Sequence, residues 1–172
     1  KTKAVMFRVN PFEASFTGGV FVAAGDVDGD GRPELIITPD EGGGPRVQVY
    51  RGTNFGKIAD FLGIEDRNFF GGARAAVGDV NGDGFGEIMV AAGFGGGPRV
   101  SMYDGKALAQ QGQRVHPVGD FFIFGGTDAQ NLRNGAFISS GDINGDGFAD
   151  IIGGGGPGGG PRVVVADGFT LL

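Results

Sequence analysis

The sequence predicts an all-β fold built from three copies of one unit, with short antiparallel strands joined by tight turns. An aspartate-rich stretch, Asp26–Gly31, recurs as Asp79–Gly84 and as Asp142–Gly147, at separations of 53 and 63 residues. The sequence Gly-Pro-Arg-Val, which begins at Gly44, recurs twice more at the same two separations. Two independent motifs that keep one register indicate internal repeats, and internal repeats decide the fold before any single element does.

The composition favours a packed domain over a disordered tail. Glycine accounts for 38 of the 172 residues, well above the roughly 7% of an average protein. At the same time 40% of the residues are hydrophobic and 16 are phenylalanine, which a disordered glycine-rich segment would lack. Many glycines beside many Val, Ile and Phe residues are typical of short strands joined by tight turns.

Each repeat contains up to four segments of alternating, β-branched or aromatic residues bounded by Gly or Pro, the pattern of short strands. The expected strands are residues 20–24, 34–37, 47–50 and 58–64 in the first unit; 73–77, 87–90, 100–103 and 121–124 in the second; and 136–140, 150–152 and 163–165 in the third. We predict a single repeat domain over residues 1–172, with units at approximately 16–65, 69–125 and 134–172. The sequence gives no convincing signal for a helix.

The longer separation before the third aspartate loop is explained by two lengthened loops. Relative to the first unit, the second has seven extra residues around Ala107–Pro117 and three around Thr127–Arg133. Such loops are where recognition of a partner is expected.

The two ends of the chain suggest how the array closes. Met6-Phe7-Arg8-Val9 resembles a fourth strand without its first three, and the third unit stops at Leu172 before any fourth strand. We therefore hypothesise that residues 3–10 form the closing fourth strand of the last sheet; a piece cut from a longer array would have the same sequence. The start, Lys1-Thr2-Lys3, has neither an initiator Met nor an apolar leader, so we expect residue 1 to follow a cleavage or a truncation.

Charge and hydropathy exclude two classes of partner. The formal net charge of −6 disfavours nucleic acid, which would favour a basic face. No apolar run approaches the roughly 20 residues needed to cross a bilayer, so we expect no membrane insertion. The absence of cysteine excludes disulfides and thiolate metal sites.

The aspartate loops predict three metal sites. Side-chain oxygens at loop positions 1, 3 and 5 can be aimed at one centre by a tight turn, and Ca²⁺ takes six to eight oxygen ligands. Glycine at positions 4 and 6 permits the backbone angles of such a turn. A carboxylate follows at position 9 in every copy, and the main-chain carbonyl of position 7 would supply a further oxygen. The predicted ligands are Asp26, Asp28, Asp30, Arg32 (carbonyl) and Glu34; Asp79, Asn81, Asp83, Phe85 (carbonyl) and Glu87; Asp142, Asn144, Asp146, Phe148 (carbonyl) and Asp150.

Alternative interpretations of these loops fit less well. An EF-hand requires Glu at position 12 and a helix beyond it, whereas position 12 here holds Ile37, Val90 and Gly153. Mg²⁺ usually retains waters rather than filling an all-protein cage. Asp-Gly turns that bind nothing would not require the carboxylate at position 9. Ten of the 20 acidic residues lie in these loops, and without a cation their carboxylates would repel one another.

The arrangement resembles FG-GAP repeats, also described as VCBS-type repeats, which occur in the propellers of integrin alpha subunits and in many bacterial secreted proteins. The resemblance rests on Phe70-Gly71, on the looser Phe16-Thr17-Gly18, on the Asp-x-Asx-Gly-Asp-Gly loop and on the Gly-Gly-Pro downstream. The family's calcium ligands map onto the fifteen positions named above. Glu34 and Glu87 stand where Asp is more usual, and the third unit lacks a clear Phe-Gly.

The resemblance implies β-propeller blades of four strands, with calcium in the turn between the first two strands of each. Propellers typically have four to eight blades, so three are too few to close. The chain is then either part of a larger ring or half of a two-chain, six-bladed assembly; an open stack of three sheets is a further alternative.

These expectations lead to one preferred function, with an enzyme and a purely structural module that self-associates as the two alternatives. The preferred function is a calcium-binding scaffold with no catalytic role, secreted (as many bacterial members of the family are) or on the cell surface, which binds a protein or glycan ligand and possesses three Ca²⁺ sites. Extracellular calcium modules commonly work at about 10⁻⁴–10⁻³ M, which matches external calcium. The enzyme alternative is a carbohydrate-active lyase or hydrolase on a propeller frame, which would need a cluster of further polar residues in one cleft.

Other polar residues receive structural interpretations. Arg46, Arg99 and Arg162 follow Pro in each repeat; they would either grip an anionic ligand or form a repeated ion pair, and we favour the ion pair. Tyr50 and Tyr103 share one strand position and are expected to pack. His116 is the sole histidine and is interpreted as a loop residue exposed to solvent.

Overall fold

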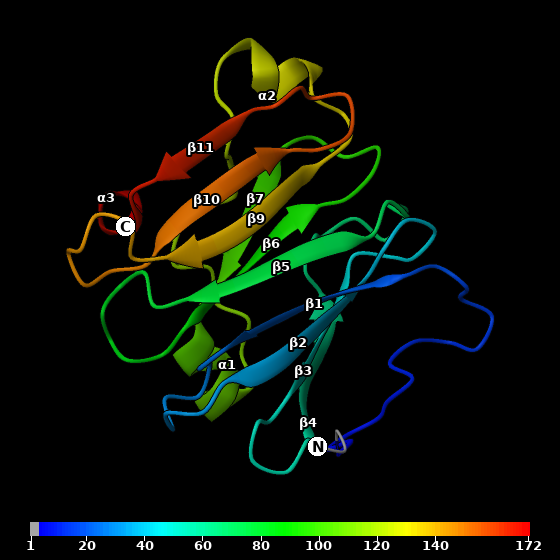
Figure 1. Ribbon diagram of the computed structural model, residues 1–172, viewed down its shortest axis with the longest axis vertical. Coiled ribbons are helices and arrows are strands. Elements are labelled where there is room, and N and C mark those ends of the chain that lie inside the picture. Colours follow the sequence, from blue (N-terminus) through cyan, green and yellow to red (C-terminus); the bar gives the residue numbers. More distant parts are fainter. Residues whose placement is uncertain (1–3) are drawn as a thin grey trace.

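The computed structural model describes residues 4–172 as three antiparallel sheets, one per repeat, stacked beside one another (Figure 1). The first sheet has the strand order β1 (Val20–Gly25), β2 (Glu34–Pro39), β3 (Arg46–Tyr50), β4 (Lys57–Leu62). The second has the order β5 (Ala73–Gly78), β6 (Glu87–Ala92), β7 (Arg99–Tyr103), β8 (Phe121–Phe122). The third contains three strands, in the order β11 (Val163–Ala166), β10 (Asp150–Gly155), β9 (Ala136–Gly141).

The predicted all-β fold of propeller-type blades is confirmed. Each of the eleven strands expected within the three units overlaps one of these strands, and all neighbouring strands pair antiparallel. The first strands of the three blades lie at the centre: β1 contacts β5, and β5 contacts β9, as Figure 1 shows. The turn between the first and second strands therefore lies at corresponding places in the three blades.

Two apolar cores hold the blades together. Between the first and second blades, Ile36, Val47 and Val49 pack with Ile88 and Val90 of the next sheet. Between the second and third blades, the second core contains the following buried residues: Met89, Val100, Met102, Ile123 and Ile151. Strand β6 is buried along its whole length because its sheet is covered on both faces, which explains its continuous apolar run.

Three short helices correct the expectation of a helix-free chain. Helix α1 (Gly105–Gln111) and helix α2 (Thr127–Asn131) lie in the two lengthened loops, and α3 (Gly168–Leu171) follows the last strand. The side chain of Asp104 caps α1 by accepting the N–H of Ala107 at 2.7 Å, and Gly112 ends it in the left-handed region, at φ 65°. None of these helices, among the described residues, has the length and apolar character that spanning a bilayer requires.

The closing strand expected from residues 3–10 does not form within this chain. Residues 4–10 contain no strand, and Lys3 lies outside the described residues. The segment lies instead against the first blade, where the Phe7 ring centroid is 5.7 Å from that of Tyr50. The third sheet consequently ends at β11.

Candidate calcium loops

The three aspartate loops share one pattern of hydrogen bonds, which begins at position 1. In the first loop, one oxygen of Asp26 accepts the N–H of Gly29 at 2.8 Å and the other accepts the N–H of Gly31 at 2.8 Å. Asp79 and Asp142 accept from the equivalent glycines, at 2.6 to 3.0 Å. The position 1 carboxylate thus folds the loop around itself.

Positions 3 and 5 continue the pattern as successive turns closed by side-chain oxygens. In the second loop, Asn81 Oδ1 accepts the N–H of Asp83 at 2.9 Å, and Asp83 Oδ1 accepts the N–H of Phe85 at 3.0 Å. The same two bonds occur in the first and third loops. These bonds close successive turns of each loop through the side-chain oxygens at positions 1, 3 and 5.

The glycines at positions 4 and 6 are required by the backbone. Gly29 and Gly31 have φ values of 73° and 81°, and the equivalent glycines of the other loops also have positive φ. Side chains other than glycine rarely adopt this conformation, so the predicted role of these glycines is confirmed.

The position 9 carboxylate is the buried anchor of each loop. Glu34 and Glu87 are 0% exposed and Asp150 is 1% exposed. Each accepts the N–H of loop position 2: Val27 at 2.9 Å, Val80 at 3.0 Å and Ile143 at 2.9 Å. A buried carboxylate with no partner would be costly, and these bonds supply part of what it needs.

Each blade also contains a glycine that the sequence reasoning missed. Gly52 donates its N–H to Glu34 Oε1 at 3.1 Å, and Gly168 donates to Asp150 Oδ1 at 3.2 Å. A Cβ built on Gly52 would lie 2.3 Å from the carbonyl oxygen of Pro33, and Gly105 and Gly168 face an equivalent carbonyl at 2.2 and 2.0 Å. The signal was present, because these three glycines repeat at the separations of 53 and 63 residues.

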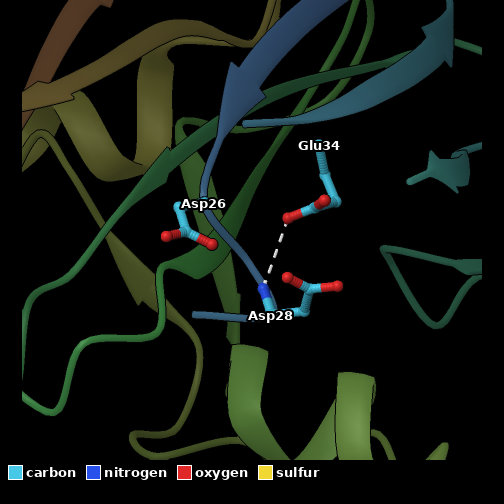
Figure 2. A group of neighbouring side chains, drawn as sticks. All are labelled: Asp26, Asp28 and Glu34. Atoms are coloured by element: carbon cyan, nitrogen blue, oxygen red, sulfur yellow. Dashed lines mark hydrogen bonds between the residues drawn. The ribbon is translucent and has the colours of Figure 1, made fainter. Parts of the chain in front are cut away.

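In the first loop three predicted ligands converge. One carboxylate oxygen from each of Asp26, Asp28 and Glu34 lies within 4.8 Å of the other two. Figure 2 shows the carboxylate of Glu34 pointing from the start of β2 across the loop toward Asp28, whose N–H donates to it at 3.3 Å. Asp30 is not part of this group of three, and its carboxylate accepts the N–H of Arg32 instead.

The second and third loops have Asn at position 3, so each carries one carboxylate fewer. In the second loop Asn81 Nδ2 donates to Glu87 Oε1 at 3.1 Å. Burial raises the pKa of Glu87 to about 7, and the negative charges of Asp79 and Asp83 act in the same direction, while the N–H bond from Val80 opposes them. A cation among these groups would stabilise the ionised form of Glu87.

Basic side chains approach two of the loops. Arg51 Nε lies 3.5 Å from Asp28 Oδ2, and Lys106 Nζ lies 3.3 Å from Asp83 Oδ2 and 5.1 Å from the centroid of the Phe85 ring. These partly exposed pairs reduce the local negative charge without neutralising it.

The residues present fit a calcium ion. The donors are hard carboxylate and amide oxygens in every loop, the class of ligand that Ca²⁺ prefers. A carboxylate oxygen has two acceptor sites, so Asp26 Oδ2, which accepts the N–H of Gly31, keeps a lone pair for a metal ion. The predicted side-chain ligands at positions 1, 3 and 5 of each loop therefore lie on one turn, and the buried carboxylate at position 9 is bonded to the backbone of the same turn.

The other polar residues take structural roles. Arg46 Nε lies 2.5 Å from Asp60 Oδ1, and Arg99 and Arg162 pair with Asp120 and Asp128, as the ion-pair interpretation predicts. The two tyrosines pack as expected, since Tyr50 and Tyr103 are 6% and 1% exposed. The exposed ring of His116 lies 4.4 Å from that of Tyr103.

Comparison with known proteins identifies the repeat. A model of an FG-GAP-like repeat matches residues 26–90, and a model of the FG-GAP repeat matches residues 71–112. Human integrin alpha-7 is 33% identical over 100 residues, a match that covers 52% of this chain and 8% of the integrin. The chain therefore spans less than a tenth of the length of that relative.

The solved structure of one rhamnogalacturonan lyase is similar in fold. Rhamnogalacturonan lyase YesX superposes with a TM-score of 0.50 at 15% identity, covering 87% of this chain and 30% of the lyase. Rhamnogalacturonan lyase YesW gives 0.49 at 13% identity, covering 87% of this chain and 31% of that lyase. At such identities the likeness to YesX concerns the fold alone. With two matches to its repeat models, which together span about half of the residues, the chain belongs to the FG-GAP repeat proteins.

Proposed function

We propose that this chain is a calcium-stabilised interaction module of a secreted or cell-surface protein, with one Ca²⁺ in each of its three loops and no catalytic role. The observation that carries the proposal is the common geometry of the loops. In each of them the side chains at positions 1, 3 and 5 accept the loop's own N–H groups, and a buried carboxylate anchors position 9.

The expected consequence is that calcium binding stabilises the fold. Acidic groups held on one turn repel one another, and a divalent ion removes that repulsion. Because the ligands come together in the folded chain, calcium at a hundredfold excess over its dissociation constant would add about 2.7 kcal/mol per site to the free energy of unfolding.

Isothermal titration with calcium, together with thermal unfolding in calcium and in EGTA, tests this proposal. We expect three equivalents of Ca²⁺ and a higher melting temperature in calcium. Asp30→Asn, Asp83→Asn and Asp146→Asn each keep an oxygen for the N–H of position 7 while removing one charge, so each should weaken binding at one site. Asp66→Asn is the matched control, because exposed Asp66 lies outside the loops. Equal melting temperatures in calcium and EGTA would contradict the proposal.

For the partner we propose a protein or a glycan that contacts the two loops lengthened in the second repeat. Helix α1 occupies the loop between β7 and β8, and helix α2 occupies the loop that follows β8. Pull-down or glycan-array binding should be lost when residues 107–117 are shortened to the length found in the first repeat, with the calcium stoichiometry unchanged. Cleavage of rhamnogalacturonan or another polysaccharide by the purified chain would contradict a non-catalytic role.

A further inference from the structure

Equivalent residues on the three blades differ sharply in exposure. Val27, Val47 and Val49 of the first blade are 0% exposed, and so are their equivalents in the second blade, Val80, Val100 and Met102. The equivalents in the third blade are Ile143, Val163 and Val165, which are 61%, 73% and 48% exposed. We call these three residues the forward face of the third blade. In the first two blades the same positions pack against the following blade.

The loops show what kind of surface fits there. A Cβ built on Gly29, at loop position 4, would lie 2.9 Å from the Phe85 ring at position 7 of the next loop, and Gly82 faces Phe148 in the same way at 2.7 Å. Gly145, the third member of the series, has nothing within 4 Å. In the first two loops, the glycine at position 4 contacts the residue at position 7 of the next loop. In the third loop the same place, beside Gly145, is open; we call it the Gly145 seat.

The first blade has a complementary face that is only partly covered. Val20 and Val22 of β1 are 48% and 66% exposed, whereas Ala73, the equivalent of Val20 in the second blade, is 0% exposed. Arg32 is exposed at loop position 7, where the other blades have Phe. A guanidinium at the Gly145 seat would lie beside the acidic third loop, which is a favourable pairing of charge.

The N-terminal segment lies where a preceding blade would place its fourth strand. Between the first two blades, Phe61 of β4 packs on Tyr103, with ring centroids 4.8 Å apart. Phe7 packs on Tyr50, the equivalent tyrosine, at 5.7 Å. The third blade lacks a fourth strand, and the outer edge of β11 pairs with no strand among residues 4–172. Unpaired edges of this kind favour strand addition.

We propose that the forward face of the third blade binds the first blade of a second copy of this chain. Residues 4–10 of that copy then pair with β11 and supply the missing fourth strand. Two such contacts, related by a two-fold axis, join two chains into one ring of six blades, within the usual range of four to eight. The valine contacts and the strand pairing of this proposal do not involve the side chains predicted to bind calcium, so association and calcium binding can be measured separately.

Sedimentation velocity over a wide concentration range tests this proposal. We expect the wild-type chain, 17.5 kDa as a monomer, to associate into a species of twice that mass. Val163→Asp and Val22→Asp should each weaken association at least about tenfold, since each places an unpaired charge in an apolar contact. Val115→Asp is the matched control, because Val115 is 40% exposed but lies in the loop after α1. On association, the backbone amides of residues 5–9 should gain protection from hydrogen exchange.

A mixing experiment distinguishes this geometry from other dimers. Mixing Val163→Asp with Val22→Asp leaves one of the two contacts with both valines intact, so the mixture should associate more strongly than either variant alone. Circular dichroism of each variant checks that it folds, and Val163→Lys repeats the test with the opposite charge. A wild-type chain that stays monomeric throughout, or a dimer weakened by Val163→Asp but not by Val22→Asp, would overturn the proposal.

Discussion

The guanidinium carbon of Arg74 lies 4.0 Å from the centroid of the Phe137 ring, across the contact between the second and third blades. The same group lies 5.4 Å from the Phe21 ring of the first blade, and the two rings meet edge to face with their centroids 6.4 Å apart. These residues hold the same position in β1, β5 and β9, so a cation and two aromatic rings form one cluster where the inner strands meet. Arg74 is 6% exposed, burial lowers its pKa, and it donates to the carbonyl oxygen of Ala136 at 3.1 Å.

A double-mutant cycle should detect this contact as coupling between blades. We expect Arg74→Met and Phe137→Leu to be coupled by about 0.5–2 kcal/mol in the free energy of unfolding, because a desolvated cation gains more from a ring face than an exposed one. Urea denaturation of the wild type, both single variants and the double variant gives the coupling. Phe122→Leu, at an exposed ring on β8, is the control and should add independently to Arg74→Met. Additive effects for the Arg74–Phe137 pair would contradict the prediction.

The ion pair of the first blade predicts a pH dependence of stability. The pKa of Asp60 is lowered by hydrogen bonds from Arg46, at 2.5 and 2.7 Å, and from Lys57 at 2.7 Å. A lowered folded-state pKa means that the stabilisation is complete above the unfolded pKa of about 3.9 and is lost as the pH falls through the lower folded value. We expect Asp60→Asn to cost about 1 kcal/mol at pH 7, a modest value because the pair is partly exposed.

The same pH series provides the control. The difference in free energy of unfolding between wild type and Asp60→Asn should shrink as the pH falls from about 4 through the lower folded-state pKa, because the Asp60 carboxylate is protonated first in the unfolded chain and then in the folded one. Asp66→Asn, at an exposed site, should show no such difference. A difference that stays constant down to pH 2 would show that protonation of Asp60 is not its cause.

The strands were predictable because their signals are local and repeated. Alternation in Val20–Gly25 reflects a strand with one covered face, and the unbroken apolar run of β6 reflects a strand covered on both faces. The turns of the aspartate loops were predictable for the same reason, since residue types at positions 1, 3, 5 and 9 recur in all three copies.

What the sequence did not reveal depends on contacts between distant residues. The bond from Gly52 to Glu34 joins residues 18 positions apart and follows only once β3 is placed beside β2. Helix α1 is seven residues long, which is too short to give an apolar stripe in the sequence. Its N-cap at Asp104 can be recognised only together with the C-cap at Gly112. Residues 4–10 have strand-like composition, but a strand forms only where it can pair with a sheet edge. The segment lies against the first blade, whereas the unpaired edge of β11 belongs to the third blade.

Arg51 predicts a difference in calcium affinity between the loops. Its Nε lies 3.5 Å from Asp28 Oδ2, whereas the equivalent positions of the other blades hold Asp104 and Asp167. Removing a positive charge beside the site should tighten binding of a cation. Arg51→Ala should lower the dissociation constant of the first loop roughly threefold at low salt, since a partly exposed pair contributes about 1 kcal/mol or less. Calcium titrations at low and high ionic strength measure the effect, which should shrink in salt. Arg67→Ala, an exposed arginine outside the loops, is the control. An unchanged or weaker first site at low salt would contradict the prediction.

The close packing of Gly52 against the first loop predicts that the anchoring of the Glu34 carboxylate contributes to the stability of the blade. A Cβ at Gly52 would lie 2.3 Å from the Pro33 carbonyl oxygen, so alanine must push β3 away from the loop and lengthen the bond from its N–H to Glu34. We expect Gly52→Ala to cost about 1–3 kcal/mol, the usual range for forcing atoms into a packed site. Gly119→Ala is the matched control, because a Cβ there has nothing within 4 Å and should leave stability nearly unchanged. Denaturation in EGTA isolates the packing effect, and titration with calcium then shows whether the loop still binds. If the two alanine variants unfold at the same denaturant concentration, the close approach between Gly52 and Pro33 does not constrain the blade, and Glu34 must be held by its bonds to Val27 and Asp28.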